Sequence, residues 1–315
     1  MDVVDKRILL VLNDNCRASY EELGKHVGLT RAAIKKRVDR LIEKGVIERF
    51  SVELSRMMVG YDWYWIEIET DGSETTESLI DAISQHPMVF VLNRLGGNKF
   101  LIFGQIVGSS GAYNLGRYLR SISCIVDVNM ERLIAVENTS ITNAGFLSLG
   151  KKETLNTRHL KILGCLVNDA RMSIAEISRK TGYSSRSIKK MIQELYNTRA
   201  VMFTLYLSPC ACGNTDFYLH MEFDEEKVKP ADIVLWLDKN FNLEYWNSWL
   251  LTRRPIMRNF FSVQSLSIIE HITEEVRNLT FTNTVEPIIK YPNKIFDSLG
   301  RTRLLELLET NEILC

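Results

Sequence analysis

Several features that define other protein classes are missing from this sequence of 315 residues. It contains no run of about 18 apolar residues, the length that a membrane-spanning helix needs. The amino terminus carries acidic residues where a secretory signal peptide would be basic. The six cysteines include no Cys-x-x-Cys pair, so neither a disulfide framework nor a zinc ribbon is indicated. We therefore expect a soluble, cytoplasmic protein with reduced thiols and no membrane partner.

The sequence also contains little that is typical of metal sites or catalytic centres. Its five histidines are dispersed along the chain, and no Ser-His-Asp or Cys-His spacing stands out. Cys210 and Cys212, with His220 nearby, are separated by one residue, and such a pair rarely completes a tetrahedral metal site alone. We predict no metal, no cofactor and no enzymatic activity.

The net charge of the chain is zero, but the charges are unevenly distributed. Residues 1–60 and 151–208 carry net charges of +3 and +7, whereas residues 61–150 and 209–315 each carry −5. Alternating basic and acidic segments are typical of a polyanion-binding module joined to a domain that does not bind. Solvent-exposed surfaces that differ in the sign of their charge by chance would give the same alternation. The sequence motifs are therefore needed to distinguish the two interpretations.

The chain contains an internal repeat with a constant shift of 154 residues. Residues 8–64 reappear as residues 162–218 without a gap, and Arg17 of the first copy matches Arg171 of the second. Two copies of one module imply two equivalent sites on one molecule.

The first copy reads as three short helices followed by a strand. Ser19 and Glu22 form a capping box at the start of the second helix. Gly28 turns the chain before the third helix, and Gly45 fits the left-handed position that ends it. The predicted elements are helices over residues 2–13, 19–27 and 30–44 and a strand over residues 46–54.

A third helix that carries cations away from its apolar stripe is the arrangement that enters the DNA major groove. Lys and Arg side chains there neutralise phosphates, and Arg31, near the helix start, suits a guanine edge. Arg37 lies close to the buried stripe, where a structural ion pair is the alternative. In the second copy Ser185 replaces Arg31, although a basic face remains. The predicted DNA-binding residues are Arg31, Lys35, Lys36, Arg40, Lys44, Arg186, Lys189 and Lys190.

These residues carry a resemblance to a known family. The segments Arg17-Ala18-Ser19, Val27-Gly28-Leu29-Thr30 and Gly45-Val46-Ile47 lie within a stretch of about 55 residues that resembles the amino-terminal winged helix-turn-helix of the leucine-responsive regulator/AsnC (feast/famine) family. The resemblance implies that each winged domain is followed by a small βαββαβ domain that dimerises and binds amino-acid effectors.

The rest of the chain permits such domains twice. Strand-like and helical segments alternate in the order βαββαβ after each winged domain, which predicts the α+β fold class with a ferredoxin-like arrangement. The predicted domains are residues 1–54 and 155–208 (winged helix-turn-helix), 60–137 and 214–292 (ferredoxin-like), and 293–315 (a helical extension).

In the resembled family the effector sits near a glycine-containing loop between the middle strands, at the interface of paired domains. Lys99 stands where the family commonly has an acidic residue, and the second copy offers Arg253-Arg254-Pro255 instead of glycines. The resemblance implies a site for a small effector such as an amino acid at Gly96, Gly97, Asn98 and Lys99, whereas these two departures from the family pattern count against amino-acid sensing.

Taken together, the sequence predicts a sequence-specific transcription regulator whose basic helices bind double-stranded DNA. It would act as a homodimer or as an intrachain pseudo-dimer. One alternative is a tetrapyrrole (sirohaem-type) decarboxylase, because some proteins that resemble the family have that activity, but such enzymes need clustered His and Arg residues. Another alternative is a protein-interaction hub that has lost DNA binding.

Overall fold

The computed structural model describes residues 1–136, 150–292 and 294–311. The chain divides into two compact units, and each unit takes segments from both copies of the repeat. The winged-helix unit contains Met1–Tyr61, Ala144–Leu207 and Asp297–Cys315, and the sheet unit contains Asp62–Asn143 and Ser208–Phe296. By sequence, the winged-helix unit carries 25 Lys and Arg against 17 Asp and Glu, whereas the sheet unit carries 14 against 22. The positive excess therefore belongs entirely to the winged-helix unit.

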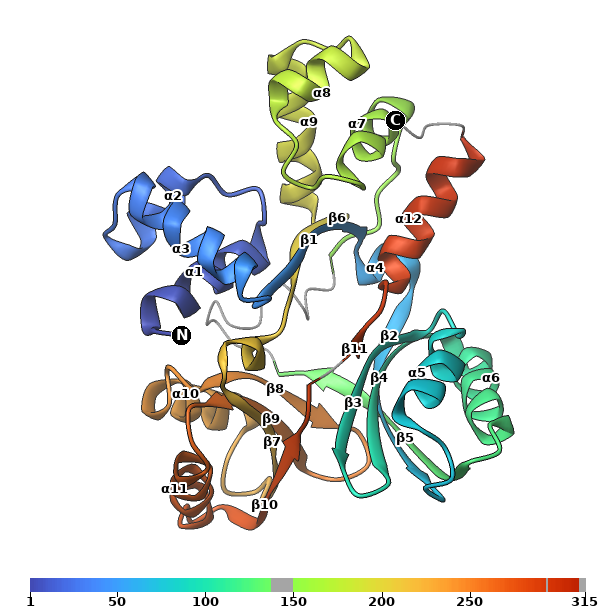
Figure 1. The fold of residues 1–315 in the computed structure, drawn as a ribbon, viewed down its shortest axis with the longest axis vertical. Coiled ribbons are helices and arrows are strands. Elements are labelled where there is room, and N and C mark those ends of the chain that lie inside the picture. Colours follow the sequence, from blue (N-terminus) through green and yellow to red (C-terminus); the bar gives the residue numbers. More distant parts are fainter. Residues whose placement is uncertain (137–149, 293, 312–315) are drawn as a thin grey trace. The chain divides into compact units, whose positions relative to one another are not determined.

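The first winged domain contains α1 (Val3–Asp14), α2 (Tyr20–Val27), α3 (Arg31–Glu43), β1 (Ile47–Leu54) and the short α4 (Arg56–Val59). The predicted capping box is present, because the Ser19 hydroxyl accepts the Glu22 backbone N–H and the Glu22 carboxylate accepts the Ser19 N–H. Gly28 ends α2 with a φ of 71°, in the left-handed region where a side chain would be strained. Local signals in the sequence thus set these boundaries (Figure 1).

The second winged domain contains α7 (Thr157–Leu166), α8 (Ile174–Thr181), α9 (Ser185–Thr198) and β6 (Val201–Leu207). Ser173 and Ser184 cap α8 and α9 as Ser19 and Thr30 cap their counterparts. Arg199 occupies the repeat position of a glycine and has a φ of 51°, the only positive φ of a non-glycine residue within the described ranges. This strained position is held by contacts with the first copy.

Strands β1 and β6 pair antiparallel and join the two copies. Phe50 lies opposite Leu205, and Ser51 lies opposite Thr204. Thr204 is the repeat counterpart of Phe50 and Leu205 that of Ser51, so the pairing is symmetric about a pseudo-twofold axis at this point. The hydrophobic core of the second winged domain, which includes Leu163 and Phe203, extends across the pair and takes in Val52 of the first copy. The two winged domains therefore form an intrachain pseudo-dimer.

The carboxy-terminal helix α12 (Leu299–Thr310) packs on the same core. Leu304 and Leu308 are fully buried in it. A Cβ at Gly300 would lie 2.3 Å from the backbone oxygen of Leu54, so only glycine allows the helix to come this close to β1. Of the extension predicted for residues 293–315, α12 belongs to the winged-helix unit, whereas β11 (Lys294–Ile295) belongs to the sheet unit.

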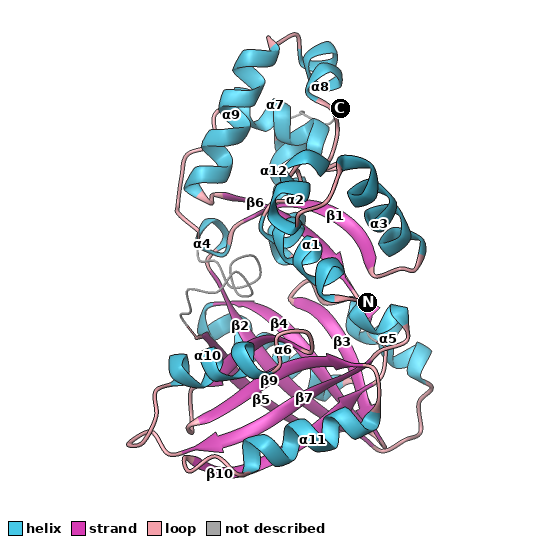
Figure 2. Ribbon diagram, turned by 90° about the vertical axis from the view of Figure 1, so that its left-hand side faces the viewer, coloured by secondary structure: helices cyan, strands magenta, loops and turns pink. Residues whose placement is uncertain are grey.

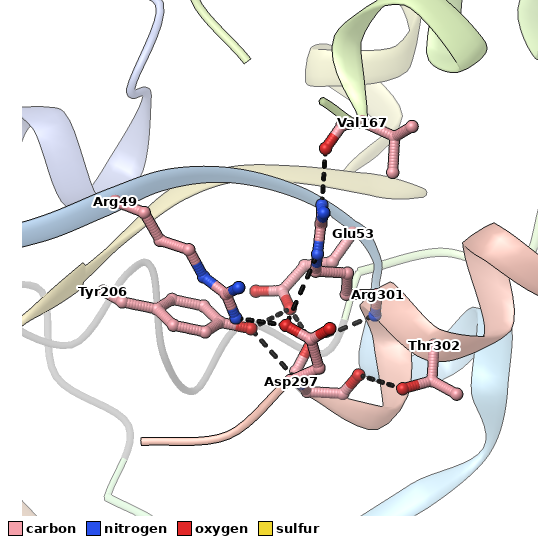
Figure 3. Close-up of polar contacts among 8 residues, drawn as sticks. Arg49, Glu53, Val167, Tyr206, Asp297, Arg301 and Thr302 are labelled. Atoms are coloured by element: carbon pink, nitrogen blue, oxygen red, sulfur yellow. Dashed lines mark hydrogen bonds and ion pairs between the residues drawn. The ribbon is translucent and has the colours of Figure 1, made fainter. Parts of the chain in front are cut away.

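Polar contacts fix the start of α12 (Figure 3). The backbone N–H of Ser298, which caps the helix, donates to the Tyr206 hydroxyl at 3.0 Å, and the Ser298 hydroxyl donates to the Glu53 carboxylate. Asp297, just before the cap, pairs with Arg49 of β1. Burial raises the pKa of Glu53 to about 7, against the opposing effect of the Arg49 guanidinium. The anchor of α12 therefore contains a carboxyl group that titrates near neutral pH.

The sheet unit contains the following elements: β2 (Tyr61–Thr70), α5 (Thr76–Ser84), β3 (Val89–Gly96), β4 (Lys99–Val107), α6 (Gly108–Ser121), β5 (Ile125–Ala135), η2 (Pro209–Cys212), β7 (Thr215–Phe223), α10 (Pro230–Asn240), β8 (Tyr245–Leu251), β9 (Ile256–Val263), α11 (Leu266–Arg277), β10 (Thr282–Lys290) and β11 (Lys294–Ile295). Each copy supplies one βαββαβ half, which confirms the predicted α+β class with ferredoxin-like domains. The sequence interpretation missed β11, α4 and η2, each of which has four residues or fewer.

Among the described residues, nine strands form one sheet in the order β10-β7-β9-β8-β5-β2-β4-β3-β11 (Figure 2). The halves join where β5 pairs with β8, with Leu133 opposite Leu251. At the other side β10 contacts β3, and the Tyr291 N–H that follows β10 donates to the Arg94 carbonyl of β3 at 2.9 Å. The two half-sheets are therefore connected along two edges.

Helices α5 and α6 cover one face of the first half, and α10 and α11 cover one face of the second. The helix-free faces of the two halves contact one another through aromatic rings. The ring of Trp65 on β2 lies 4.9 Å from that of Tyr218 on β7, in an edge-on arrangement. The buried Arg258 on β9 pairs with Glu67 at 2.9 Å and stacks over Trp65. Aromatic and ionic contacts thus hold the two halves together.

The constant repeat shift is wrong at its carboxyl end. Ile66 and Ile68 face the helices of their half, and the residues that do so in the second copy are Leu219 and Met221, a shift of 153 rather than 154. Tyr64 packs against the helix side, whereas its assigned match Tyr218 lies on the other face. A one-residue slip moves a strand side chain to the opposite face, so the identity of these tyrosines is not a structural equivalence.

Candidate nucleic-acid interface

Helix α3 presents a basic face opposite its buried stripe. Ile34 and Val38 are fully buried, which directs the intervening positions outward. Arg31 and Lys36 are exposed and form no ion pair with any described residue. Lys35 is 62% exposed and pairs with Asp39 at 2.6 Å, one turn along the helix. The last predicted contact of this helix, Lys44, is an exposed residue at its carboxyl end.

A buried carboxylate fixes the orientation of α3. Asp5 on α1 is 2% exposed, and its two oxygens lie 2.7 Å from Arg37 Nη1 and from Arg40 Nη2. Arg37 also pairs with Asp2 at 2.7 Å, and these hydrogen bonds raise the pKa of its guanidinium. Arg37 is therefore the structural ion-pair residue that the sequence left as an alternative. Arg40 shares this partner but keeps 47% of its side chain exposed, so it can also reach outward.

Helix α9 presents the corresponding face of the second copy. Ile188 and Met191 are buried, and the three predicted contacts Arg186, Lys189 and Lys190 are exposed. Lys190 pairs with Glu194 at 3.6 Å and remains 78% exposed. All eight predicted DNA-binding residues are thus exposed on or at the end of the two third helices, five of them without an ion pair to the described parts of the chain.

Sequence reasoning did not single out Gln193. This residue is exposed one turn beyond Lys189, and its amide nitrogen donates to Asn197 at 2.7 Å. Gln side chains can form paired hydrogen bonds with adenine, so the position belongs to the candidate interface. The i, i+4 spacing from Lys189 on one helical face was the signal that could have identified it.

The two helices belong to one rigid arrangement because Arg17 and Arg171 cross the pseudo-twofold axis. Arg17 donates to the carbonyl oxygens of Ala170 and Met172, and Arg171 donates to those of Cys16 and Ala18. Each arginine therefore binds the backbone on either side of its own counterpart.

The predicted effector residues lie at the turn between β3 and β4. Gly96 and Gly97 have φ values of 127° and 56°, so the backbone of this turn requires glycine. Asn98 and Lys99 are exposed, and the Asn98 carbonyl accepts the backbone N–H of Thr70 at 2.9 Å. The four residues are contiguous and form a hairpin tip, and the hydroxyl of the buried Thr70 also donates to the Asn98 carbonyl at 3.4 Å.

The described ranges contain no group of three or more His, Cys, Asp or Glu residues placed to hold a metal ion. Cys210 instead contacts the Ser208 hydroxyl at 3.3 Å, and Cys212 donates to the Pro209 carbonyl. Within the same ranges no helix has the length and apolar character that a bilayer crossing needs.

Comparison with known families places a DNA-binding domain in each copy. Residues 1–42 match the AsnC-type helix-turn-helix domain, and residues 155–197 match a winged helix-turn-helix DNA-binding domain. The matched ranges contain nearly all of α3 and nearly all of α9, respectively.

Relatives of known sequence are named as regulators. An uncharacterized HTH-type transcriptional regulator of Pyrococcus horikoshii is 28% identical over 120 residues, which is 37% of this chain and 79% of that protein. The HTH-type transcriptional regulator Ptr1 of Methanocaldococcus jannaschii is 36% identical over 62 residues, which is 20% of this chain and 42% of that protein. Against Ptr1 the chain therefore spans less than half of the relative's length.

A solved structure resembles the chain over nearly its whole length. The siroheme decarboxylase NirDL matches with a TM-score of 0.59 and 12% identity, covering 98% of this chain and 99% of that chain. At this identity the likeness is one of fold, and it extends through both copies of the repeat. The chain thus contains an AsnC-type helix-turn-helix domain in its first copy and a second, diverged winged helix-turn-helix domain in its second copy.

Proposed function

We propose that this protein regulates transcription by inserting α3 and α9 in the major groove of double-stranded DNA. The observation that carries the proposal is a repeated one. Lys35 and Lys36 on α3, and Lys189 and Lys190 on α9, are exposed at the same positions of the repeat. Divergence has changed most other exposed positions of these helices, yet this pair of cations occurs in both. Phosphate contacts made by both lysines of each helix account for the presence of the pair in both copies.

The residues of the interface divide into two roles. The four lysines neutralise phosphates and position each helix without reading sequence. Arg31, exposed at the amino-terminal end of α3, reads a guanine by two hydrogen bonds to its major-groove edge. Arg40 and Lys44 continue the cationic face toward the carboxyl end of α3 and add phosphate contacts.

The sheet unit supplies pairing within the chain, and we propose that its β3–β4 turn at Gly96 and Gly97 is where a small effector such as an amino acid is sensed. The exposed amide and ammonium groups of Asn98 and Lys99 offer donors to a carboxylate. A panel of free amino acids, tested for a rise in thermal transition temperature, identifies such a ligand, and absence of any rise removes this part of the proposal.

DNA binding is tested by fluorescence anisotropy with random-sequence duplexes at several salt concentrations. The variant Lys35→Glu/Lys36→Glu should bind far more weakly and show a shallower dependence of affinity on salt, because each lost phosphate contact lowers the slope by about one. A matched control, Lys227→Glu/Lys229→Glu, reverses two exposed lysines of the sheet unit and should bind as the wild type does. Equal affinity of both variants at low salt would refute the proposal and favour a protein-interaction role.

A second candidate function is tetrapyrrole decarboxylation, the activity named for NirDL. One observation favours it: His220 on β7 lies directly opposite Arg258 on β9, so a His and an Arg do come together in the sheet unit. Burial, followed by the charge of Arg258, lowers the pKa of His220 to about 4, so its imidazole is neutral at physiological pH. An absorbance titration with haem or sirohaem tests whether the chain binds a tetrapyrrole, since the spectrum of the tetrapyrrole shifts on binding and stays unchanged without it.

A further inference from the structure

We propose that one chain occupies a DNA target made of two unlike half-sites at a fixed spacing. This inference rests on the proposed function and extends it, because it specifies the class of DNA sequence that the two third helices read. It follows from two properties of the winged-helix unit: a symmetric scaffold and asymmetric reading surfaces.

The scaffold places α3 and α9 in equivalent, inverted positions. The register of β1 with β6 is symmetric, since Phe50 opposite Leu205 is matched by Thr204 opposite Ser51. The reciprocal hydrogen bonds of Arg17 and Arg171 obey the same axis. Reading helices related by a twofold axis contact half-sites in inverted orientation, about one turn of DNA apart.

The scaffold also prevents the two helices from moving independently. The hydrophobic core of the second winged domain takes in Cys16, Val52 and Leu54 of the first copy, and α12 packs in the same core. Arg199 adds a contact that has no symmetric counterpart, because the matching residue of the first copy is Gly45. The guanidinium of Arg199 pairs with Asp14 of α1 at 2.7 Å, and the Tyr196 hydroxyl donates to the same carboxylate. The spacing of the half-sites is therefore set by the folded chain and not by a flexible linker.

The reading surfaces differ where base contacts are made. At the amino-terminal end Arg31-Ala32 of α3 corresponds to Ser185-Arg186 of α9, so the arginine moves by one residue, about 100° around the helix. One turn beyond the paired lysines, Asp39 corresponds to Gln193. An arginine prefers guanine, an acidic side chain accepts from cytosine, and a glutamine prefers adenine.

The charge of the two surfaces differs as well. Arg40 of α3 corresponds to Glu194 of α9, which reverses the sign at one position of the DNA-facing side. The paired lysines are common to both helices, so each half-site receives similar phosphate contacts. The two halves of the target thus share backbone positioning and differ in base sequence.

Selection from random duplexes of about 30 base pairs, enough for two half-sites one turn apart, tests the inference directly. The wild-type chain should select two different half-site sequences in one relative order, with one chain per duplex. The swap variant Ser185→Arg/Arg186→Ala, which gives α9 the amino-terminal end of α3, should select a more palindromic site. The mirror variant Arg31→Ser/Ala32→Arg should do the same with the other half-site.

Binding to defined duplexes then gives magnitudes. Duplexes that carry either half-site twice should bind the wild-type chain at least about tenfold more weakly than the mixed duplex, since one wrong base pair alone costs roughly 5-fold to 150-fold. Insertion of about 5 base pairs, half a turn of DNA, between the half-sites should remove the gain in affinity that the second half-site provides.

The outcomes separate this inference from the function it rests on. A wild-type chain that selects a true palindrome, or swap variants that select the wild-type sequence, overturns the unlike half-sites and leaves DNA binding intact. Tolerance of the half-turn insertion overturns the fixed spacing. Failure of the wild-type chain to enrich any sequence overturns the proposed function and this inference together.

Discussion

Arg17 and Arg171 exchange hydrogen bonds across the pseudo-twofold axis of the winged-helix unit. Each guanidinium donates to two backbone carbonyl groups that flank the other arginine in sequence. The guanidinium of Arg171 also lies over the rings of Tyr20 and Phe50, both from the first copy. Because a guanidinium presents several donors in a fixed fork, this exchange fixes both the distance and the orientation of the two winged domains.

Replacing either arginine should loosen this unit. We expect Arg17→Ala and Arg171→Ala each to lower the free energy of unfolding by about 1–3 kcal/mol, since each leaves two carbonyl groups without their donor. Urea titration followed by far-ultraviolet circular dichroism measures the loss. All five tryptophans lie in the sheet unit, so their fluorescence reports separately on the part that should not change.

Arg179→Ala is the matched control, because Arg179 is 77% exposed and lies 4.0 Å from its partner Glu176. Its effect should stay within about 0.5 kcal/mol. Equal stability of all three variants would show that the reciprocal contacts do not hold the pseudo-dimer together.

Much of the fold could be predicted from the sequence because local signals are strong in it. The capping box of Ser19 and the turn at Gly28 set the boundaries of α2 within a residue. The alternation of apolar residues identified the strands of both ferredoxin-like halves, because one face of each strand is buried under helices. Exposure of the paired lysines followed from the position of the apolar stripe.

Contacts that join distant segments could not be predicted in this way. Arg17 was visible in the sequence as an identity between the copies and as part of the family resemblance, and neither reveals a partner such as Met172. The buried carboxylate of Asp5 likewise gave no sequence signal that it would bind Arg37 and Arg40. The position of α12 depends on Gly300, whose missing side chain gives no hint of the strand that lies against it.

At Arg199 the cost of a strained backbone can be measured separately from the stabilisation that its ion pair provides. Its left-handed φ of 51° costs free energy that glycine would not incur, while its guanidinium pairs with Asp14 at 2.7 Å. Arg199→Ala loses the pair and keeps the strain, whereas Arg199→Gly loses the pair and relieves the strain. We expect the alanine variant to be less stable than the glycine variant by about 1 kcal/mol in urea titrations. The reverse order would show that the backbone at this position is not strained.

The stability of the α12 anchor should depend on pH through Glu53. Its folded-state pKa of about 7 lies above the ordinary value of 4.5, so the folded protein holds the proton more tightly. The resulting stabilisation is fully present below pH 4.5 and is lost as the pH rises through 7. Groups that face this carboxyl are Arg49 from β1, Tyr206 from β6, and Asp297 and Arg301 from the start of α12.

Hydrogen exchange of the α12 amides measures this dependence. Protection in the wild type should fall between pH 5 and pH 8 by an amount equivalent to roughly 1–3 kcal/mol, after correction for the intrinsic exchange rate. Glu53→Gln, which keeps a neutral acceptor, should make the protection nearly independent of pH. Glu309→Gln, at an exposed position of the same helix, should leave the wild-type dependence unchanged. A flat wild-type profile would contradict the assignment.

Arg31 and Arg37 lie less than two turns apart on α3, and the last prediction assigns them different roles. Arg31 contacts a DNA base, whereas Arg37 stabilises the fold. Arg31 is exposed and makes no ion pair with a described residue, so Arg31→Ala should leave the unfolding free energy within about 0.5 kcal/mol of the wild type. The same change should weaken binding to the selected DNA by about 1–3 kcal/mol and relax the preference at one base pair.

Arg37→Ala should behave in the opposite sense. It removes hydrogen bonds to Asp2 and to the buried Asp5, so the unfolding free energy should fall by about 1.5–3 kcal/mol. At a temperature where the variant is still folded, its base preference should match that of the wild type, because Arg37 has no base to read. Anisotropy titrations on wild-type and single-base-altered duplexes, run beside urea titrations, place each arginine in one class. If Arg37→Ala changes base preference while Arg31→Ala does not, α3 is presented to DNA by a different face from the one that its buried stripe defines.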